Sequence, residues 1–229
     1  MKVIGLIGGM SWESTAVYYK IINETVKDRL GGLSSAKILL YSLNFAEIEK
    51  LQREEKWAEA TEVMRDAARR LEGGGADCLI ICTNTMHKMA SEVEGAVNIP
   101  LLHIADATAR EIKKKKIERV ALLGTKFTME EDFYKGRLME KYFLDVIIPP
   151  EEDRNIVNQV IYHELCLGKI REESRKEFRR IIEQLAGGGA EGVILGCTEI
   201  SLLIKEQDSP VELFDTTAIH ARAAVDFAL

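Results

Sequence analysis

The chain has 229 residues, of which 46% are apolar and 30% carry a charge, a composition typical of globular proteins. The net charge is −6 and the only basic run is residues 113–116, so we expect no nucleic-acid partner. The apolar start of the chain gives way to Glu13 and polar residues, unlike a signal peptide, and no apolar run is long enough to span a membrane.

Short apolar runs are the candidate strands. They are continuous rather than alternating, as expected of a parallel sheet that is buried on both faces. In chain order they cover residues 3–7, 38–43, 78–81, 101–104, 120–123, 146–148, 193–195 and 211–214.

Amphipathic segments with a helical period separate these runs. A further charged stretch around Gln52 is also helical in character. The regular alternation of strand and helix predicts an α/β fold. The helical segments cover residues 12–30, 57–72, 84–94, 105–116, 129–142, 153–186 with a break near Gly168, and 216–229.

An internal repeat divides the chain. The phrase GGGADCLII at residues 73–81 returns as GGGAEGVIL at 187–195, an offset of 114 positions. Each glycine triplet follows a helix and precedes a strand, which favours a left-handed C-cap over a phosphate loop. We therefore predict two pseudo-symmetric parallel-sheet lobes, with the active site in the cleft between them. The first lobe comprises residues 1–104 and 209–229, and the second comprises residues 105–208.

Reactive side chains stand where one strand of each lobe ends. In the repeat, Thr83 aligns with Cys197, and Cys82 aligns with a glycine. Ligands bind at the carboxyl ends of parallel strands, and we expect the helix N-terminus there to lower a thiol pKa from about 8.5 toward neutrality. A carbon acid held between two such groups would lose a proton on one face and regain it on the other, which is racemisation or epimerisation.

Several motifs resemble those of the cofactor-independent aspartate/glutamate racemase family. They are IGLIGGM (4–10), ICTNTMH (81–87) and VILGCTEI (193–200), together with GGMSWEST, LHIADAT and FDTTAIHA. The resemblance spans the whole chain. It implies a homodimeric isomerase that acts on aspartate, glutamate or a wider range of amino acids without pyridoxal phosphate, metal or nucleotide. The cytoplasmic location that we expect comes instead from the cysteines, whose pattern is that of reduced thiols.

The first motif departs from the family pattern, which has a catalytic cysteine directly before Asn-Thr. Here that residue is Thr83, and the thiol has moved back to Cys82. The internal repeat and the Asn-Thr anchor both place Thr83 at the catalytic position. Neighbouring residues of a strand point to opposite faces, so only one of the two should face the site. We predict Thr83 and Cys197 as the catalytic pair, with Cys82 as the alternative.

The resemblance also implies substrate contacts from Met10, Gln52, Asn84, Thr85 and Thr198. Asn84, Thr85 and Thr198 have a second explanation, because short polar side chains cap helices. Glu199 orients either the catalytic residues or the substrate ammonium group, or is simply an acid in the first turn of a helix. His87, four residues after Thr83, either tunes the site or packs on a helix face.

Two other readings stay open from the sequence alone. The same scaffold occurs in maleate isomerases and malonate-type decarboxylases, for which one competent cysteine is enough. A small-molecule binding protein without catalysis is the third reading. The four cysteines form no CxxC pair and the histidines show no zinc spacing, so we expect reduced thiols and no metal site.

Overall fold

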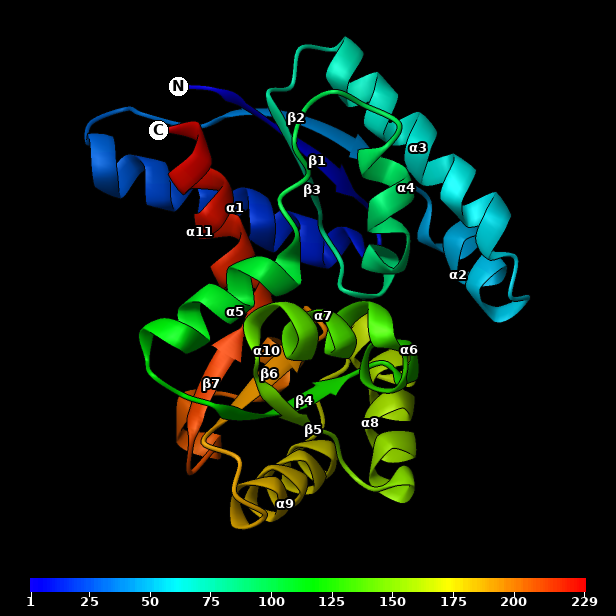
Figure 1. Ribbon diagram of the computed structural model, residues 1–229, viewed down its shortest axis with the longest axis vertical. Coiled ribbons are helices and arrows are strands. Elements are labelled where there is room, and N and C mark those ends of the chain that lie inside the picture. The colour runs from blue at the N-terminus through cyan, green and yellow to red at the C-terminus, as the bar shows by residue number, and fades with distance from the viewer. The chain divides into compact units, whose positions relative to one another are not determined.

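The computed structural model describes all 229 residues and divides them into two units (Figure 1). Unit 1 contains residues 1–104 and 220–229, and unit 2 contains residues 105–219. The chain returns to unit 1 later than residue 209, where the sequence placed the boundary. The reason is that β7 (Glu212–Asp215) pairs with β6 (Gly192–Gly196) in the sheet of unit 2.

Unit 1 is built on a parallel sheet of three strands in the order β2-β1-β3. One face packs against α2, α3 and α4 and the other against α1 and α11, as Figure 1 shows. Burial on both faces explains the continuous apolar runs of β1 and β3. The elements are β1 (Val3–Gly8), α1 (Trp12–Leu30), β2 (Lys37–Ser42), α2 (Phe45–Arg53), α3 (Trp57–Gly73), β3 (Cys78–Ile81), the 3-10 helix η1 (Thr85–Met89), α4 (Ala90–Glu94) and the part of α11 (Thr216–Ala228) that follows residue 219.

Unit 2 repeats this plan with one more strand, in the order β5-β4-β6-β7, again all parallel. The pairs β1–β3 and β4–β6 occupy equivalent places in the two sheets. The predicted fold of two parallel-sheet lobes is therefore confirmed. The elements of unit 2 are α5 (Ile104–Lys114), β4 (Arg119–Gly124), α6 (Lys126–Glu130), α7 (Asp132–Tyr142), β5 (Asp145–Ile147), α8 (Glu151–His163), η2 (Leu165–Leu167), α9 (Glu172–Gly187), β6, α10 (Ile200–Leu203), η3 (Glu206–Asp208) and β7.

The repeated glycine phrase ends a helix in each unit. Gly75 has φ +94° and Gly189 has φ +95°, a left-handed conformation that glycine adopts without a Cβ penalty. The Gly75 N–H donates to Glu72 O at 2.9 Å, and the Gly189 N–H donates to Ala186 O at 2.9 Å. The third glycine of each triplet thus turns the chain from α3 into β3 and from α9 into β6.

The acidic residue two positions after each glycine triplet accepts a hydrogen bond from the neighbouring central strand. The Asp77 carboxylate accepts the Val3 N–H at 2.6 Å, and the Glu191 carboxylate accepts the Arg119 N–H at 3.0 Å. Val3 and Arg119 are the first residues of β1 and β4. In both units, therefore, the same carboxylate-to-backbone hydrogen bond aligns the equivalent pair of strands, and this accounts for the repeated phrase.

Three expected elements differ from the structure. Residues 101–104 do not form a strand: Leu101 makes a single parallel bridge to Leu79, and α5 already begins at Ile104. The expected helix at 129–142 is two helices, α6 and α7, because Glu131 between them is extended. The expected helix at 84–94 likewise begins as the 3-10 helix η1 and becomes α-helical only at Ala90.

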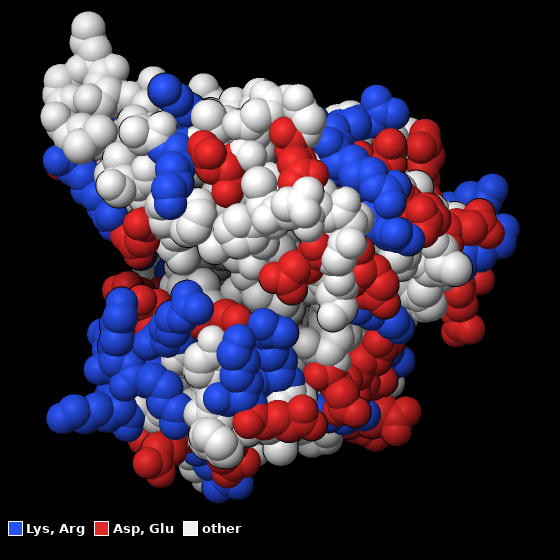
Figure 2. All heavy atoms as spheres, turned by 45° about the horizontal axis from the view of Figure 1, so that its top comes forward, with Lys and Arg blue, Asp and Glu red and all other residues white.

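The surface carries charges of both signs. Figure 2 shows Lys and Arg side chains intermingled with Asp and Glu side chains over much of the face in view. Several charged side chains of the protein form ion pairs one helical turn apart, such as Lys20 with Glu24 at 3.7 Å and Arg70 with Asp66 at 2.6 Å. No helix has the length and apolar character that crossing a membrane requires.

Candidate active site

The residues expected at the first half of the site lie past the carboxyl end of β3. Cys82 follows β3 directly, is fully buried, and belongs to the core cluster that α1 and α11 cover. Leu79 and Ile81 belong to the cluster on the opposite face of the sheet. Thr83 is half-buried and lies outside both clusters. The strand alternation therefore turns Cys82 into the core and leaves Thr83 accessible.

The Cys82 thiol also lacks the electrostatics of a reactive group. Burial raises its pKa far above the ordinary range, and no cation offsets that effect. Cys78, on the same face of the sheet, has its pKa raised to about 11, first by burial and then by Asp77. Both thiols stay protonated at neutral pH and act as small apolar side chains of the core.

Asn84 and Thr85 lead into η1 and are both buried, with 2% and 6% of their surface exposed. Asn84 occupies the N-cap position, yet its side chain makes no capping hydrogen bond. The capping explanation that the sequence allowed for Asn84 is therefore wrong. A 3-10 helix of five residues begins there instead of an α-helix.

Met10 and Gln52 approach the same end of the sheet from other elements. Met10 follows β1, is 3% exposed, and shares a core cluster with Met86 of η1. Gln52 lies in the last turn of α2, is 4% exposed, and its Nε2 donates to the Met86 sulfur at 3.0 Å. Unit 1 thus gathers its expected substrate-binding residues around the segment that carries Thr83.

The second half of the site follows β6. Cys197, Thr198 and Glu199 are all buried, with 8%, 7% and 4% of their surface exposed. The Cys197 thiol donates to Glu199 Oε2 at 3.0 Å, and the Thr198 hydroxyl donates to the same oxygen at 2.7 Å. One carboxylate oxygen therefore holds both side chains. Glu199 precedes α10 but makes no capping hydrogen bond.

This environment keeps the Cys197 thiol protonated. Burial raises its pKa well above the ordinary value, and the Glu199 carboxylate, by its negative charge, raises it further. The Glu199 N–H opposes the shift but does not outweigh it. The expected lowering by a helix N-terminus is wrong, because α10 has only four residues and its dipole is correspondingly small.

Two residues near these half-sites are not among the expected site residues. In unit 1, His87 Nδ1 lies 2.8 Å from the Thr83 carbonyl oxygen. In unit 2, Thr217 follows β7, the strand next to β6, and is 1% exposed with a hydroxyl that has no hydrogen-bond partner. The four-residue spacing from Thr83 is the sequence signal for His87, whereas Thr217 gives none beyond its place after a strand.

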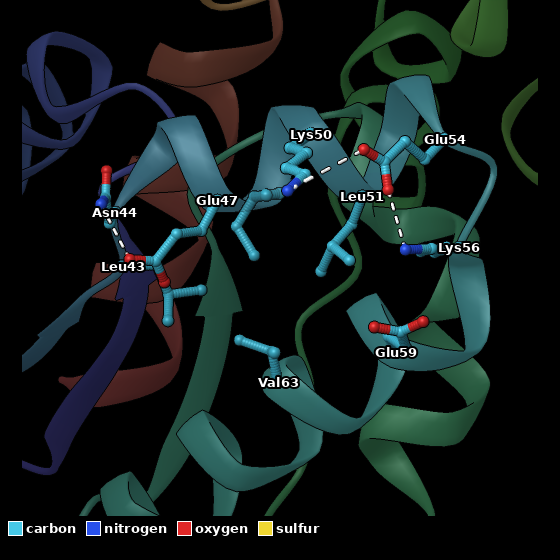
Figure 3. Close-up of a pocket in the computed structure, with 10 residues that line it drawn as sticks. Leu43, Asn44, Glu47, Lys50, Leu51, Glu54, Lys56, Glu59 and Val63 are labelled. Atoms are coloured by element: carbon cyan, nitrogen blue, oxygen red, sulfur yellow. Dashed lines mark hydrogen bonds and ion pairs between the residues drawn. The ribbon is translucent and has the colours of Figure 1, made fainter.

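The structure also contains a pocket of about 250 Å³ in unit 1, outside these half-sites (Figure 3). It lies between α2 and α3, with an apolar floor that includes Leu51 and Val63. Charged side chains at its rim already pair, since Glu54 contacts Lys56 at 2.8 Å and Lys50 at 4.0 Å. None of the expected catalytic or substrate-binding residues lines this pocket.

Comparisons with known proteins identify the family of the chain. The model of the Asp/Glu/Hydantoin racemase family matches residues 7–224. The broad specificity amino-acid racemase RacX of Bacillus subtilis is 24% identical over 97% of this chain and 96% of its own length.

Solved structures extend the comparison. A Yersinia pestis protein assigned as an Asp/Glu racemase is 56% identical, with a TM-score of 0.94 over 100% of this chain and 99% of its own. An aspartate racemase homologue from Pyrococcus horikoshii OT3 is 38% identical, with a TM-score of 0.86 over 100% of this chain and 99% of its own. The expected family and amino-acid racemase activity are confirmed: the chain belongs to the Asp/Glu/hydantoin racemase family.

Proposed function

We propose that this protein racemises aspartate, glutamate or a wider range of amino acids without a cofactor, and that Thr83 and Cys197 transfer the proton at the α-carbon. The observation that supports the pair is the equivalence of β3 and β6. Each ends in an accessible or hydrogen-bonded proton-transfer group at the carboxyl edge of its sheet, while Cys82 is directed into the core.

The resting state of Cys197 sets the order of events. In the direction in which Cys197 acts as base, its proton passes to Glu199 Oε2, which already accepts it in a hydrogen bond. The thiolate then removes the α-proton, and the electron pair of the broken C–H bond delocalises into the α-carboxylate. The Thr83 hydroxyl protonates the opposite face and recovers a proton from water, and Glu199 returns its proton to solvent.

The substrate needs hydrogen-bond donors for its carboxylates. We assign this binding role to Met10, Gln52, Asn84, Thr85 and Thr198, of which the amide and hydroxyl side chains supply donors. Glu199 was expected either to bind the substrate or to orient the catalytic residues. Its hydrogen bonds to Cys197 and Thr198 support the orienting role.

A chiral assay tests the proposal. Purified protein, dialysed against a chelator and free of pyridoxal phosphate, is incubated with L-aspartate and separately with L-glutamate. We expect the D-enantiomer to accumulate to an equal mixture, because enantiomers have the same free energy. Wild-type protein that leaves these and other amino acids unchanged would contradict the proposal, and turnover of maleate or an arylmalonate would redirect it.

We also propose that the protein works in the cytoplasm as a homodimer. All four cysteines are free, which suits a reducing compartment. Trp12 is 67% exposed and Tyr19 is 55% exposed, and the two lie seven residues apart on one side of α1. Such an apolar pair is a candidate subunit contact. Light scattering on the wild type and on Trp12→Glu tests this, with a monomeric wild type as the contrary result.

A further inference from the structure

Three of the four histidines of the chain gather inside unit 1, and the proposed proton transfer uses none of them. His87, His103 and His220 are buried, with 2%, 8% and 0% of their surface exposed. The rings of His87 and His103 lie 4.6 Å apart between centroids, and those of His87 and His220 lie 5.7 Å apart. Through His87, this buried cluster adjoins the segment that carries Thr83.

The hydrogen bonds of His87 define its tautomer. The Thr83 carbonyl oxygen can only accept, so His87 Nδ1 carries a proton and donates it over 2.8 Å. The Ile104 N–H can only donate, so His87 Nε2 accepts it over 3.2 Å. His87 is therefore a neutral imidazole that joins the Thr83 carbonyl to the first residue of α5.

The far end of this link is itself held in place. His220 Nε2 donates to the Leu102 carbonyl oxygen over 2.6 Å, and His220 Nδ1 accepts the Tyr18 hydroxyl over 2.9 Å. Tyr18 and His220 are both fully buried, and Tyr18 belongs to the core cluster that α1 and α11 cover. Residues 102–104 are thus fixed from two directions, and His87 transmits that fixed position to Thr83.

Thr83 needs such an anchor. It lies after the last residue of β3 and before the first residue of η1, so neither element holds its carbonyl group. Asn84 adds no capping hydrogen bond. Cys197, by contrast, is oriented directly through its own side chain by Glu199.

From these contacts we propose that His87 is a positioning residue for Thr83. The imidazole sets the backbone of Thr83 so that its hydroxyl stays on the substrate side of the chain. It exchanges no proton with the substrate. This inference rests on the proposed function, because it assigns His87 a role only if Thr83 is catalytic.

Two substitutions separate the two hydrogen bonds of His87. His87→Asn keeps an N–H near the place of Nδ1, so it can still donate to the Thr83 carbonyl oxygen. His87→Gln reaches the place of Nε2, so its oxygen can still accept the Ile104 N–H, but its bond to Thr83 is lost. His103→Asn is the matched control, since it removes a histidine of the same cluster that has no bond to Thr83 among those described above.

We expect His87→Gln to lower kcat for L-aspartate on the order of 10²-fold, because misplacing a reacting group by about 1 Å has an effect of that size. His87→Asn keeps the bond to Thr83 but loses the one to Ile104, so it should lose clearly less kcat than His87→Gln. His103→Asn should stay within about threefold of the wild type in kcat, with KM changed little in all three. Equal loss of kcat in His87→Asn and His87→Gln, or loss in His103→Asn as well, would overturn the proposal in favour of a packing role.

A double substitution provides a readout that simple packing would not move. In Thr83→Ala, Cys197 should still exchange the α-proton of one enantiomer with D2O. Adding His87→Gln to Thr83→Ala should leave that exchange rate unchanged, because His87 acts only through Thr83. A further fall would overturn the positioning role. Full racemisation by Thr83→Ala alone would instead contradict the proposed function.

A measurement on the unmodified protein covers the case in which the His87 variants do not fold. Nitrogen NMR shifts of the imidazoles report which ring nitrogen carries the proton. We expect a neutral His87 protonated at Nδ1 and a neutral His220 protonated at Nε2. A charged His87, or one protonated at Nε2, could not make both hydrogen bonds and would overturn the inference.

Discussion

The two half-sites share a scaffold but hold their reactive residues in different ways. At the end of β6, Glu199 contacts the Cys197 thiol directly, so an anion controls both its orientation and its protonation. At the end of β3, His87 contacts only the backbone of Thr83, so a neutral ring controls position alone. Under the proposed mechanism, equivalent strands of a repeated fold supply two chemically distinct proton-transfer groups.

Removing the thiol should have the largest effect. We expect Cys197→Ala to lower kcat/KM for L-aspartate about 10⁴-fold, the upper range for loss of an acid–base group. Both directions must fall equally, because the equilibrium constant between enantiomers is one. Chiral chromatography of each reaction measures this. A loss below tenfold would place the chemistry elsewhere.

Removing the hydroxyl should cost less, because water can replace a weak acid. We expect Thr83→Ala to lower kcat/KM about 10²-fold, and Cys82→Ala to change it less than about threefold. Thr83→Ser should recover most of the loss, since it keeps the hydroxyl. The same assay decides, and a larger loss in Cys82→Ala than in Thr83→Ala would reverse the assignment of the first half-site.

Neutralising Glu199 should lower both the Cys197 pKa and the rate of turnover. The carboxylate raises the Cys197 pKa, so in Glu199→Gln the alkylation of Cys197 by iodoacetamide should begin at lower pH. Turnover should still fall about tenfold, because the acceptor for the thiol proton is gone. Peptide mass spectrometry distinguishes Cys197 from Cys166. Alkylation that shifts to higher pH would contradict the role given to Glu199.

The buried His220 of unit 1 should make the free energy of unfolding depend on pH. Burial lowers the His220 pKa to about 4, and the Leu102 hydrogen bond offsets this only in part. Between about pH 6.5 and 4 the unfolded chain therefore binds a proton that the folded protein does not. We expect the free energy of unfolding to fall by up to about 3 kcal/mol as the pH drops through that window.

Urea titrations of the wild type and His220→Gln measure this contribution. The variant keeps a side chain that can donate to Leu102 O but has no group that titrates, so its stability should depend less on pH. An identical slope in both proteins over pH 4 to 6.5 would show that His220 is not the source.

The smallest effects should be equal in the two units. Gly75→Ala and Gly189→Ala each place a Cβ on a left-handed turn, so each should destabilise the protein by about 1 kcal/mol. Thermal unfolding measures both. A clear difference between the two would show that the repeated turns do not carry equal strain.

Much of the fold could be predicted because parallel strands that are buried on both faces leave continuous apolar runs. The same rule wrongly predicted a strand at residues 101–104, where an apolar run makes one bridge and then enters α5. The run at β7 looks alike but pairs fully with β6. What separates them is the partner strand, and local sequence does not encode the partner.

The candidate site was predictable to the extent that it depends on the repeat and on strand alternation. Both indicated Thr83 rather than Cys82, and the core clusters place Cys82 as alternation requires. The protonation of Cys197 was not predictable, because the length of α10 and the position of Glu199 Oε2 are tertiary features. The anchoring of Thr83 by His87 also depends on where Ile104 lies.

Exchange of the α-proton with D2O by Thr83→Ala tests the central claim most directly. The claim is that each residue serves one face of the α-carbon. Proton NMR of D- and L-aspartate should show rapid loss of the α-proton signal from one enantiomer, while the other enantiomer forms about 10²-fold more slowly than in the wild type. Exchange from both enantiomers at similar rates, or racemisation at the wild-type rate, would contradict the account.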